Sequence, residues 1–186
     1  FLVVSFLTSI MGLNLPSTVF YFVPRLGAES RRSFVFQLSL MTVICAAATS
    51  LLVLLGSGAI ARGFENPDLG PLLRVACLYP FANLILQQVP QFMISIDRAA
   101  RAGVYTLLSE GSRAVIVVIL AWADQPLSAM FLWLVVGSLI LAAIALWDMF
   151  RLSPGGRVGL DLPLIKEILG YALPMLAATA VGLVNR

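Results

Sequence analysis

The sequence contains no histidine, only two cysteines and few charged side chains, and each shortage excludes a class of function. Histidine is the commonest metal ligand and general base, so its absence argues against most metal sites and many hydrolytic mechanisms. Cys45 and Cys77 lie within apolar runs, where a cysteine acts as a small buried hydrophobe. We find no Gly-rich phosphate loop, Cys/His cluster or nucleophile–base pair. We therefore expect no enzyme, no metal site and no cofactor.

The scarcity of charge also indicates the class of protein. Only 11% of the residues are charged, against about 25% in soluble domains, and 60% are hydrophobic. The mean hydropathy is +0.99. The net charge of +3 comes from single basic residues scattered between apolar runs, so it does not indicate a nucleic-acid partner. These features predict an all-α, polytopic transmembrane helical bundle in a lipid bilayer.

Apolar segments of spanning length recur along the chain and predict about six transmembrane helices, since one span needs about 20 mostly apolar residues. The predicted segments are 1–23, 34–61, 71–96, 103–123 and 127–150, followed by a linker at 151–163 and a truncated helix at 164–186. The chain begins inside a hydrophobic segment and stops where a helix is ending. We therefore expect a fragment of a longer protein.

The basic residues predict which loops face the cytoplasm, because cytoplasmic loops carry an excess of Lys and Arg. Loops 24–33, 97–102 and the linker with the first turn after it hold eight basic residues, whereas the alternate loops hold two. Loops 24–33, 97–102 and 151–163 are therefore predicted to be cytoplasmic. Trp122 and Trp147 then fall at opposite membrane surfaces, as an aromatic belt requires.

The segment 103–123 has a polar face inside an otherwise apolar helix. At 100° per residue, Thr106, Ser109, Glu110 and Arg113 share one narrow side. Arg113 lies ten residues into the segment, roughly 15 Å deep and near the middle of the bilayer. An arginine at this depth costs at least about 3 kcal/mol on insertion scales, so it normally faces a partner or a hydrated cavity.

The segment 71–96 is the most polar, and its polar residues also gather on one face. Asn83, Gln87 and Gln91 follow each other at helical spacing. Gln87 lies roughly 14 Å from the cytoplasmic end, level with Arg113. Because consecutive antiparallel helices are usually neighbours, we expect the two faces to line one hydrated cavity that attracts an anion.

A purely structural interpretation of these residues stays open. Glu110 and Arg113 are at i, i+3 and can neutralise each other. Amide side chains often hold membrane helices together without binding a substrate. Asp97 and Arg101 are predicted to form an i, i+4 brace within their loop.

Three stretches resemble the polysaccharide flippases of the multidrug/oligosaccharidyl-lipid/polysaccharide exporter superfamily. They are YFVPRLGAESRRSFVFQ, QQVPQFMISIDRAARAGVYTLLSEGSRAVIVVIL and IKEILGYALPMLAATAVGLVNR. The resemblance implies a MATE-like transporter with two six-helix lobes around a cationic cavity. This chain would supply most of the N-terminal lobe (1–150), the linker and the first helix of the second lobe.

The resemblance further implies that a lipid-linked oligosaccharide is flipped across a bacterial inner membrane by alternating access, with a proton or sodium ion as a possible coupling ion. The substrate-binding residues it implies, together with the polar faces, are Arg113, Glu110, Gln87, Gln91, Asn83 and Ser109. A drug/cation antiporter of the same superfamily is the closest alternative. A membrane-embedded glycosyltransferase or polymerase would need larger outer loops, and a structural subunit would not need so long a polar stripe.

Overall fold

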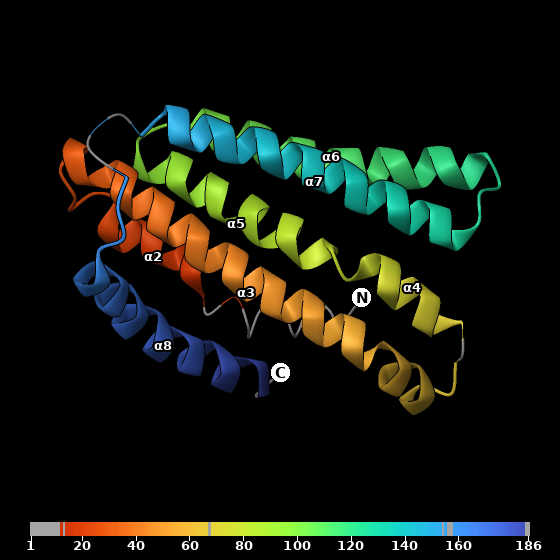
Figure 1. Ribbon diagram of the computed structural model, residues 1–186. Coiled ribbons are helices and arrows are strands. Elements are labelled where there is room, and N and C mark those ends of the chain that lie inside the picture. The colour runs from red at the N-terminus through yellow and green to blue at the C-terminus, as the bar shows by residue number, and fades with distance from the viewer. Residues whose placement is uncertain (1–11, 13, 67, 154, 156–157, 185–186) are drawn as a thin grey trace.

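The computed structural model describes residues 12, 14–66, 68–153, 155 and 158–184, and every regular element among them is an α-helix. Figure 1 shows an elongated bundle of roughly antiparallel long helices. The helices are α2 (Leu15–Phe22), α3 (Ala28–Gly63), α4 (Leu69–Ala76), α5 (Tyr79–Ser95), α6 (Ala99–Trp122), α7 (Leu127–Arg151) and α8 (Leu162–Val184). The predicted all-helical membrane bundle is confirmed.

Among the described residues, three helices are long and apolar enough to span a membrane, or four if one bent pair is counted. The residues 30–63 of α3, together with α6 and α7, are each long and apolar enough to span, and α4 with α5 makes a fourth, bent candidate. Only α2 represents the predicted segment 1–23, because residues 1–11 and 13 lie outside the described part. α8 covers most of the predicted 164–186, and residues 185–186 are likewise outside it.

Helix α3 begins six residues earlier than predicted, at Ala28 instead of Phe34. Gly27 before it is extended, with φ −61° and ψ 159°, and the helix runs uninterrupted from there. Arg31 and Arg32 therefore belong to the first turns of a helix, not to a loop. The charges did not stop the helix because arginine is a good helix former.

The predicted segment 71–96 is not one straight helix. The chain bends by 44° between α4 and α5, with Cys77 and Leu78 at the break. Pro80 explains the break, because it has no N–H to donate to the carbonyl of Ala76 and its ring crowds that carbonyl. The bend points α4 away from the line of α5 (Figure 1).

Helix α5 is the centre of the bundle and contacts α2, α3, α6 and α7. Val89, Phe92 and Met93 on α5 are fully buried in this core. On α7 the buried residues facing it include Ala142 and Ala145, whose small side chains let two membrane helices approach closely. The polar face of α5 is consequently held at a fixed position against its neighbours.

The connections of the bundle fall into two groups at its two ends (Figure 1). The α2–α3, α5–α6 and α7–α8 connections lie at one end, and the α3–α4 and α6–α7 connections lie at the other. The carbonyl oxygen of Gly159 in the α7–α8 linker accepts hydrogen bonds from Ser33 Oγ at 3.2 Å and Gln37 Nε2 at 2.9 Å. The three basic connections thus share one end of the molecule.

Asp148 on α7 joins α6 at the same end. It lies 3.5 Å from Arg101 Nη1 and accepts a hydrogen bond of 3.0 Å from the hydroxyl of Tyr105. The predicted brace between Asp97 and Arg101 is therefore wrong: Arg101 pairs with the next helix. Asp97 has a φ of 61° in the turn before α6, which takes it off the helical register that an i, i+4 pair needs.

Helix α6 packs only on one side and exposes most of its surface. Leu107 and Val118 are 74% and 67% exposed, and Trp122 at its end is 91% exposed. Trp147 is also exposed and lies near the opposite end of the bundle, on α7. An apolar outer surface with tryptophans near both ends is what a lipid-facing helix pair requires.

Gly137 on α7 lies against Ile116 of α6. A Cβ atom added there would lie 3.0 Å from Cδ1 of Ile116, so a large side chain would have to displace that isoleucine. We expect Gly137→Leu to destabilise the bundle by about 1–3 kcal/mol through overpacking, measured as a lower midpoint of thermal unfolding in detergent. Gly111→Leu on α6 is the control, since an added Cβ meets nothing within 4 Å there. Equal midpoints for the two variants would contradict this packing.

Candidate functional site

The polar face of α6 is built as the helical spacing predicts. Arg113 lies 14 residues from the start of α6 and nine from its end, or about 21 Å and about 14 Å along the axis. The sequence predicts that Arg113 lies roughly 15 Å from the start of its helix. Because α6 begins four residues earlier than predicted, Arg113 instead lies slightly past the helix centre. It remains well inside the length of a span.

Arg113 and Glu110 form an ion pair, with 3.0 Å between Nη1 and Oε1. The pair is asymmetric, because the arginine side chain is 20% exposed and the glutamate side chain is 69% exposed. The guanidinium carbon also lies 5.4 Å from the centre of the Tyr79 ring, within the range of a cation–π contact. Arg113 is therefore held by α5 and its own helix while Glu110 reaches outward.

The guanidinium of Arg113 keeps hydrogen-bonding capacity that the ion pair does not use. Arginine has five N–H donors, and Glu110 accepts from one Nη nitrogen. The Nε atom is buried and has no hydrogen-bond partner among the described residues. A buried unsatisfied donor on a charged group is costly unless a ligand or water fills it.

The polar faces of α5 and α6 meet in one cleft of about 180 Å³, as predicted. Asn83 and Gln87 come from α5, and Ser109, Glu110 and Arg113 come from α6. The remaining lining residues are Leu86, Pro90 and Thr106. Five of the six predicted site residues are thus brought together; we call this space the polar cleft.

Pro90 lies inside α5 and lines the polar cleft. A proline inside a helix cannot donate to the carbonyl four residues earlier, which here is that of Leu86. Leu86 and Pro90 both line the polar cleft. The carbonyl of Leu86 therefore lacks the donor that a residue other than proline would supply at position 90.

Gln91, the sixth predicted site residue, does not line the polar cleft. It lies one turn beyond Gln87, yet the cleft ends at Pro90. Its Oε1 atom is buried and has no hydrogen-bond partner in the described part of the chain. Whether Gln91 contacts a substrate stays a prediction.

Beyond Arg113 a second and larger space of about 510 Å³ continues along α6. Tyr79, Glu110 and Arg113 line it together with Ala114, Val117, Val118 and Leu134, and we call it the lower cleft. Glu110 and Arg113 line both clefts. The ion pair therefore stands at the boundary between a polar and a mainly apolar space.

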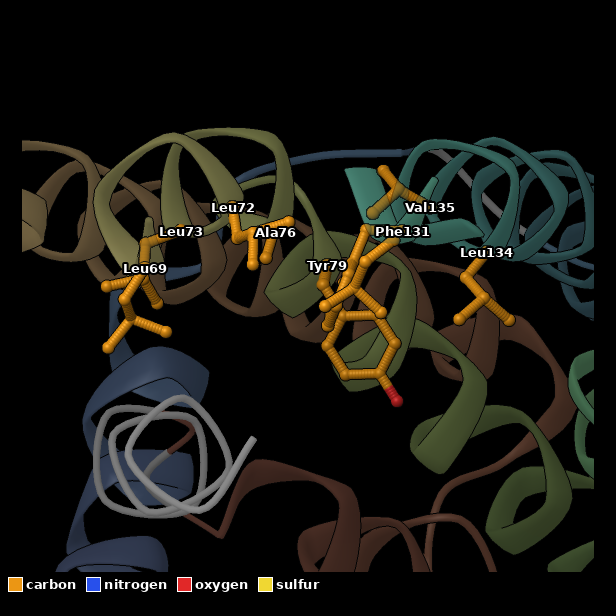
Figure 2. Close-up of a pocket in the computed structure, with 9 residues that line it drawn as sticks. Leu69, Leu72, Leu73, Ala76, Tyr79, Phe131, Leu134 and Val135 are labelled. Atoms are coloured by element: carbon orange, nitrogen blue, oxygen red, sulfur yellow. The ribbon is translucent and has the colours of Figure 1, made fainter. Parts of the chain in front are cut away.

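A third space lies between α4 and the first turns of α7, and we call it the apolar slot (Figure 2). It has a volume of about 160 Å³. Its lining is Leu69, Leu72, Leu73, Ala76, Tyr79, Leu127, Phe131, Leu134 and Val135. In Figure 2 the Tyr79 hydroxyl is at the side of its ring away from the leucines of α4.

Two residues of importance were not singled out from the sequence. Tyr79 lies four residues before Asn83 and eight before Gln87, so extending the polar face of α5 by one turn would have found it. Gln37 is fully buried and anchors the linker through Gly159. No signal in the local sequence distinguishes Gln37 from the other polar residues of α3.

Gln88, the neighbour of Gln87 on α5, is a core residue. It is 1% exposed, and its Oε1 atom lies 3.0 Å from the Thr42 hydroxyl on α3. Its Nε2 atom is 4.0 Å from the sulfur of Met149 on α7. Gln88 therefore connects three helices and stays outside the polar cleft.

Metal binding finds no support in the part of the chain that the structure describes, where no three His, Cys, Asp or Glu side chains gather closely enough to hold an ion. Both cysteines are free thiols.

Comparison with known proteins gives a family. Residues 27–186, which include α3 to α8, match the family described as polysaccharide biosynthesis protein. Comparison with curated proteins and with solved structures finds no match. The match covers most of the chain and both helices of the polar cleft. This helical membrane protein therefore belongs to the family of polysaccharide biosynthesis proteins.

Proposed function

We propose that this protein flips a lipid-linked oligosaccharide, with a polyprenyl-pyrophosphate carrier, across a bacterial inner membrane during polysaccharide biosynthesis. The observation that supports the proposal most is the environment of Arg113. Its guanidinium lies deep in a spanning helix, beside amides from α5, and retains a buried donor without a partner among the described residues. The protein acts as a transporter, not as an enzyme.

The proposal follows from the cost of moving an anion through hydrocarbon. An unpaired phosphate in a low-dielectric slab is very unfavourable. Arg113 offers charge and several donors in a planar arrangement that suits phosphate oxygens. Asn83 and Gln87 offer amide donors to phosphate or sugar oxygens in the same cleft.

The mechanism is alternating access in a MATE-like, two-lobe transporter of which this chain forms most of one lobe. The polar cleft would face the central cavity, and a second lobe would close its other side. A proton or sodium gradient is the proposed source of energy. Glu110 is the membrane carboxylate on which such a coupling ion could act, since it is 69% exposed beside Arg113.

A drug/cation antiporter is the second candidate, and the same exposed carboxylate favours it. Glu110 protrudes further from the protein than Arg113 does, so a cation could approach it first. An arginine 3.0 Å from that carboxylate would nevertheless repel a cationic drug. The buried Nε donor of Arg113, which has no partner among the described residues, favours an anionic substrate over a cation.

The proposed function is tested by deleting the gene and following the lipid-linked intermediate. We expect the deletion strain to lose surface polysaccharide and to accumulate its lipid-linked precursor on the cytoplasmic face. Complementation with the intact gene should restore the glycan. Normal surface glycan together with a loss of ethidium efflux would replace the flippase by the antiporter.

The orientation of the protein rests on the three basic connections at one end of the bundle, which we propose are cytoplasmic. With Cys45 and Cys77 replaced by alanine, a cysteine at Ser30 or Ala100 should be protected from an impermeant thiol reagent in intact cells. A cysteine at Asn66 or Gln125 should react, because both lie at the opposite end and are exposed. Labelling in the reverse pattern would invert the orientation.

A further inference from the structure

The apolar slot has no role in the proposed contacts to phosphate and sugar. Its lining consists of aliphatic and aromatic side chains from α4, the start of α5 and the start of α7. The slot lies beside the 44° bend between α4 and α5, where α4 packs against α7. We ask which ligand such a slot suits.

We propose that the apolar slot holds a segment of the polyprenyl chain of the transported lipid while its pyrophosphate lies at Arg113. This inference rests on the proposed function and adds to it a binding site for the hydrocarbon part of the substrate. The slot is on the same lobe as the polar cleft. One lobe would therefore hold both the pyrophosphate and a segment of the polyprenyl chain.

Shared lining residues connect the slot to the charged site. Tyr79 and Leu134 line both the apolar slot and the lower cleft. Glu110 and Arg113 line both the lower cleft and the polar cleft. The three spaces therefore lie next to one another, in an order that runs from apolar at α4 to polar at Gln87.

An amphiphile with a charged group at one end matches this order. The hydrocarbon would contact the leucines of α4. Tyr79 would lie between the apolar and the charged parts of the ligand, because its ring lines the slot and also contacts the guanidinium of Arg113. In Figure 2 the tyrosine hydroxyl is directed away from the leucines of α4, so the α4 side of the slot presents hydrocarbon surface. The inferred ligand is continuous from an apolar chain to a phosphate.

The size of the slot limits its occupant. Its volume of about 160 Å³ is close to that of an apolar cavity of about 150 Å³ that binds benzene-sized molecules. A helix is about 10–12 Å across with its side chains, so two of its turns alone would exceed this volume. A short stretch of a branched isoprenoid chain fits.

Two photoreactive probes test the inference on the intact protein in lipid nanodiscs. Both are polyprenyl pyrophosphates with a diazirine, placed beside the pyrophosphate in the head probe and on the nearest isoprene units in the tail probe. Crosslinked peptides are identified by mass spectrometry. We expect the head probe to label residues around Arg113 and the tail probe to label the slot at α4 and the start of α7.

Ala76→Phe fills the slot and should reduce the yield of the tail crosslink. Losing contact with about two methylene groups corresponds to a roughly fifteenfold weaker interaction. Leu72→Ala keeps the slot open but removes contacts, and we expect a smaller loss of the same crosslink. The matched control is Leu132→Phe, because Leu132 is beside Phe131 on α7 but 51% exposed to the outside.

The outcomes separate the inference from the function on which it rests. Labelling around Arg113 by the head probe without labelling of the slot by the tail probe would overturn the inference and keep the flippase. If neither probe labels its expected site, both the inference and the proposed flippase function are contradicted. Equal displacement of the tail probe by phosphatidylglycerol would show a general acyl-chain groove and overturn the inference. Selective displacement by unlabelled polyprenyl pyrophosphate is the expected result.

Discussion

Arg113→Ala should reduce export of the surface polysaccharide by about two orders of magnitude, with the amount of protein in the membrane nearly unchanged. This reduction in export corresponds to the loss of charge-assisted hydrogen bonds to phosphate that are worth about 3 kcal/mol. The protein should still insert and fold, because the substitution removes a costly charge from a spanning helix. Export is measured as surface glycan, and abundance is measured by immunoblot of the membrane fraction.

Two further variants separate a substrate role of Arg113 from simple pairing with Glu110. Arg113→Lys should keep part of the activity, since the charge remains but the planar set of donors is lost. The double variant Glu110→Gln, Arg113→Gln removes both charges of the 3.0 Å pair and leaves neither one unpaired. We expect it to be as inactive as Arg113→Ala. Full activity of the double variant would show that Arg113 serves only its neighbour and would end the substrate role.

Gln88→Ala should be the most destabilising single change among the polar residues of the core. Gln88 is 1% exposed and touches α3 and α7 from α5, so truncation leaves a void at the junction of three helices. Voids of this kind cost about 2–4 kcal/mol. The measurement is the midpoint of thermal unfolding in detergent, and it should fall clearly below that of the unchanged protein.

Gln88→Met is the control that separates volume from hydrogen bonding. Methionine has nearly the same length and fills the same space against Met149. Thr42 keeps a partner, since its hydroxyl also lies 2.8 Å from the carbonyl of Leu38 and carries one proton to donate. We expect a change within about 1 kcal/mol. A loss as large as that of Gln88→Ala would show that the amide, not its volume, stabilises the junction.

The cleft between α5 and α6 illustrates what helical periodicity determines well. Asn83 and Gln87 follow each other by four residues, and Glu110 and Arg113 by three, so each pair must share a face of any helix that contains it. The short connection between the helices makes them neighbours and sets the level at which the faces meet. These constraints are local, which is why the predicted cleft residues were found together.

Gln87, Gln88 and Gln91 show where this reasoning ends. All three are amides within five positions, yet one lines the polar cleft, one is buried against Thr42 and one lies beyond the cleft. Their fates depend on which neighbouring helix covers each side of α5. Composition and spacing do not contain that information.

The sequence by itself determined that the protein is an all-helical membrane protein, where most of its helices lie, and which faces are polar. It could do so because backbone N–H and C=O groups in hydrocarbon must hydrogen-bond within their own segment, as a helix allows. The length of each apolar run then indicates the length of the helix. Only the tertiary structure decided the 44° bend before Pro80, the apolar slot beside this bend, and the pairing of Arg101 with Asp148. Pro80 marks where the helix breaks, but the size of the bend, the slot between α4 and α7 and the ion pair between α6 and α7 depend on the distances and angles at which the helices pack.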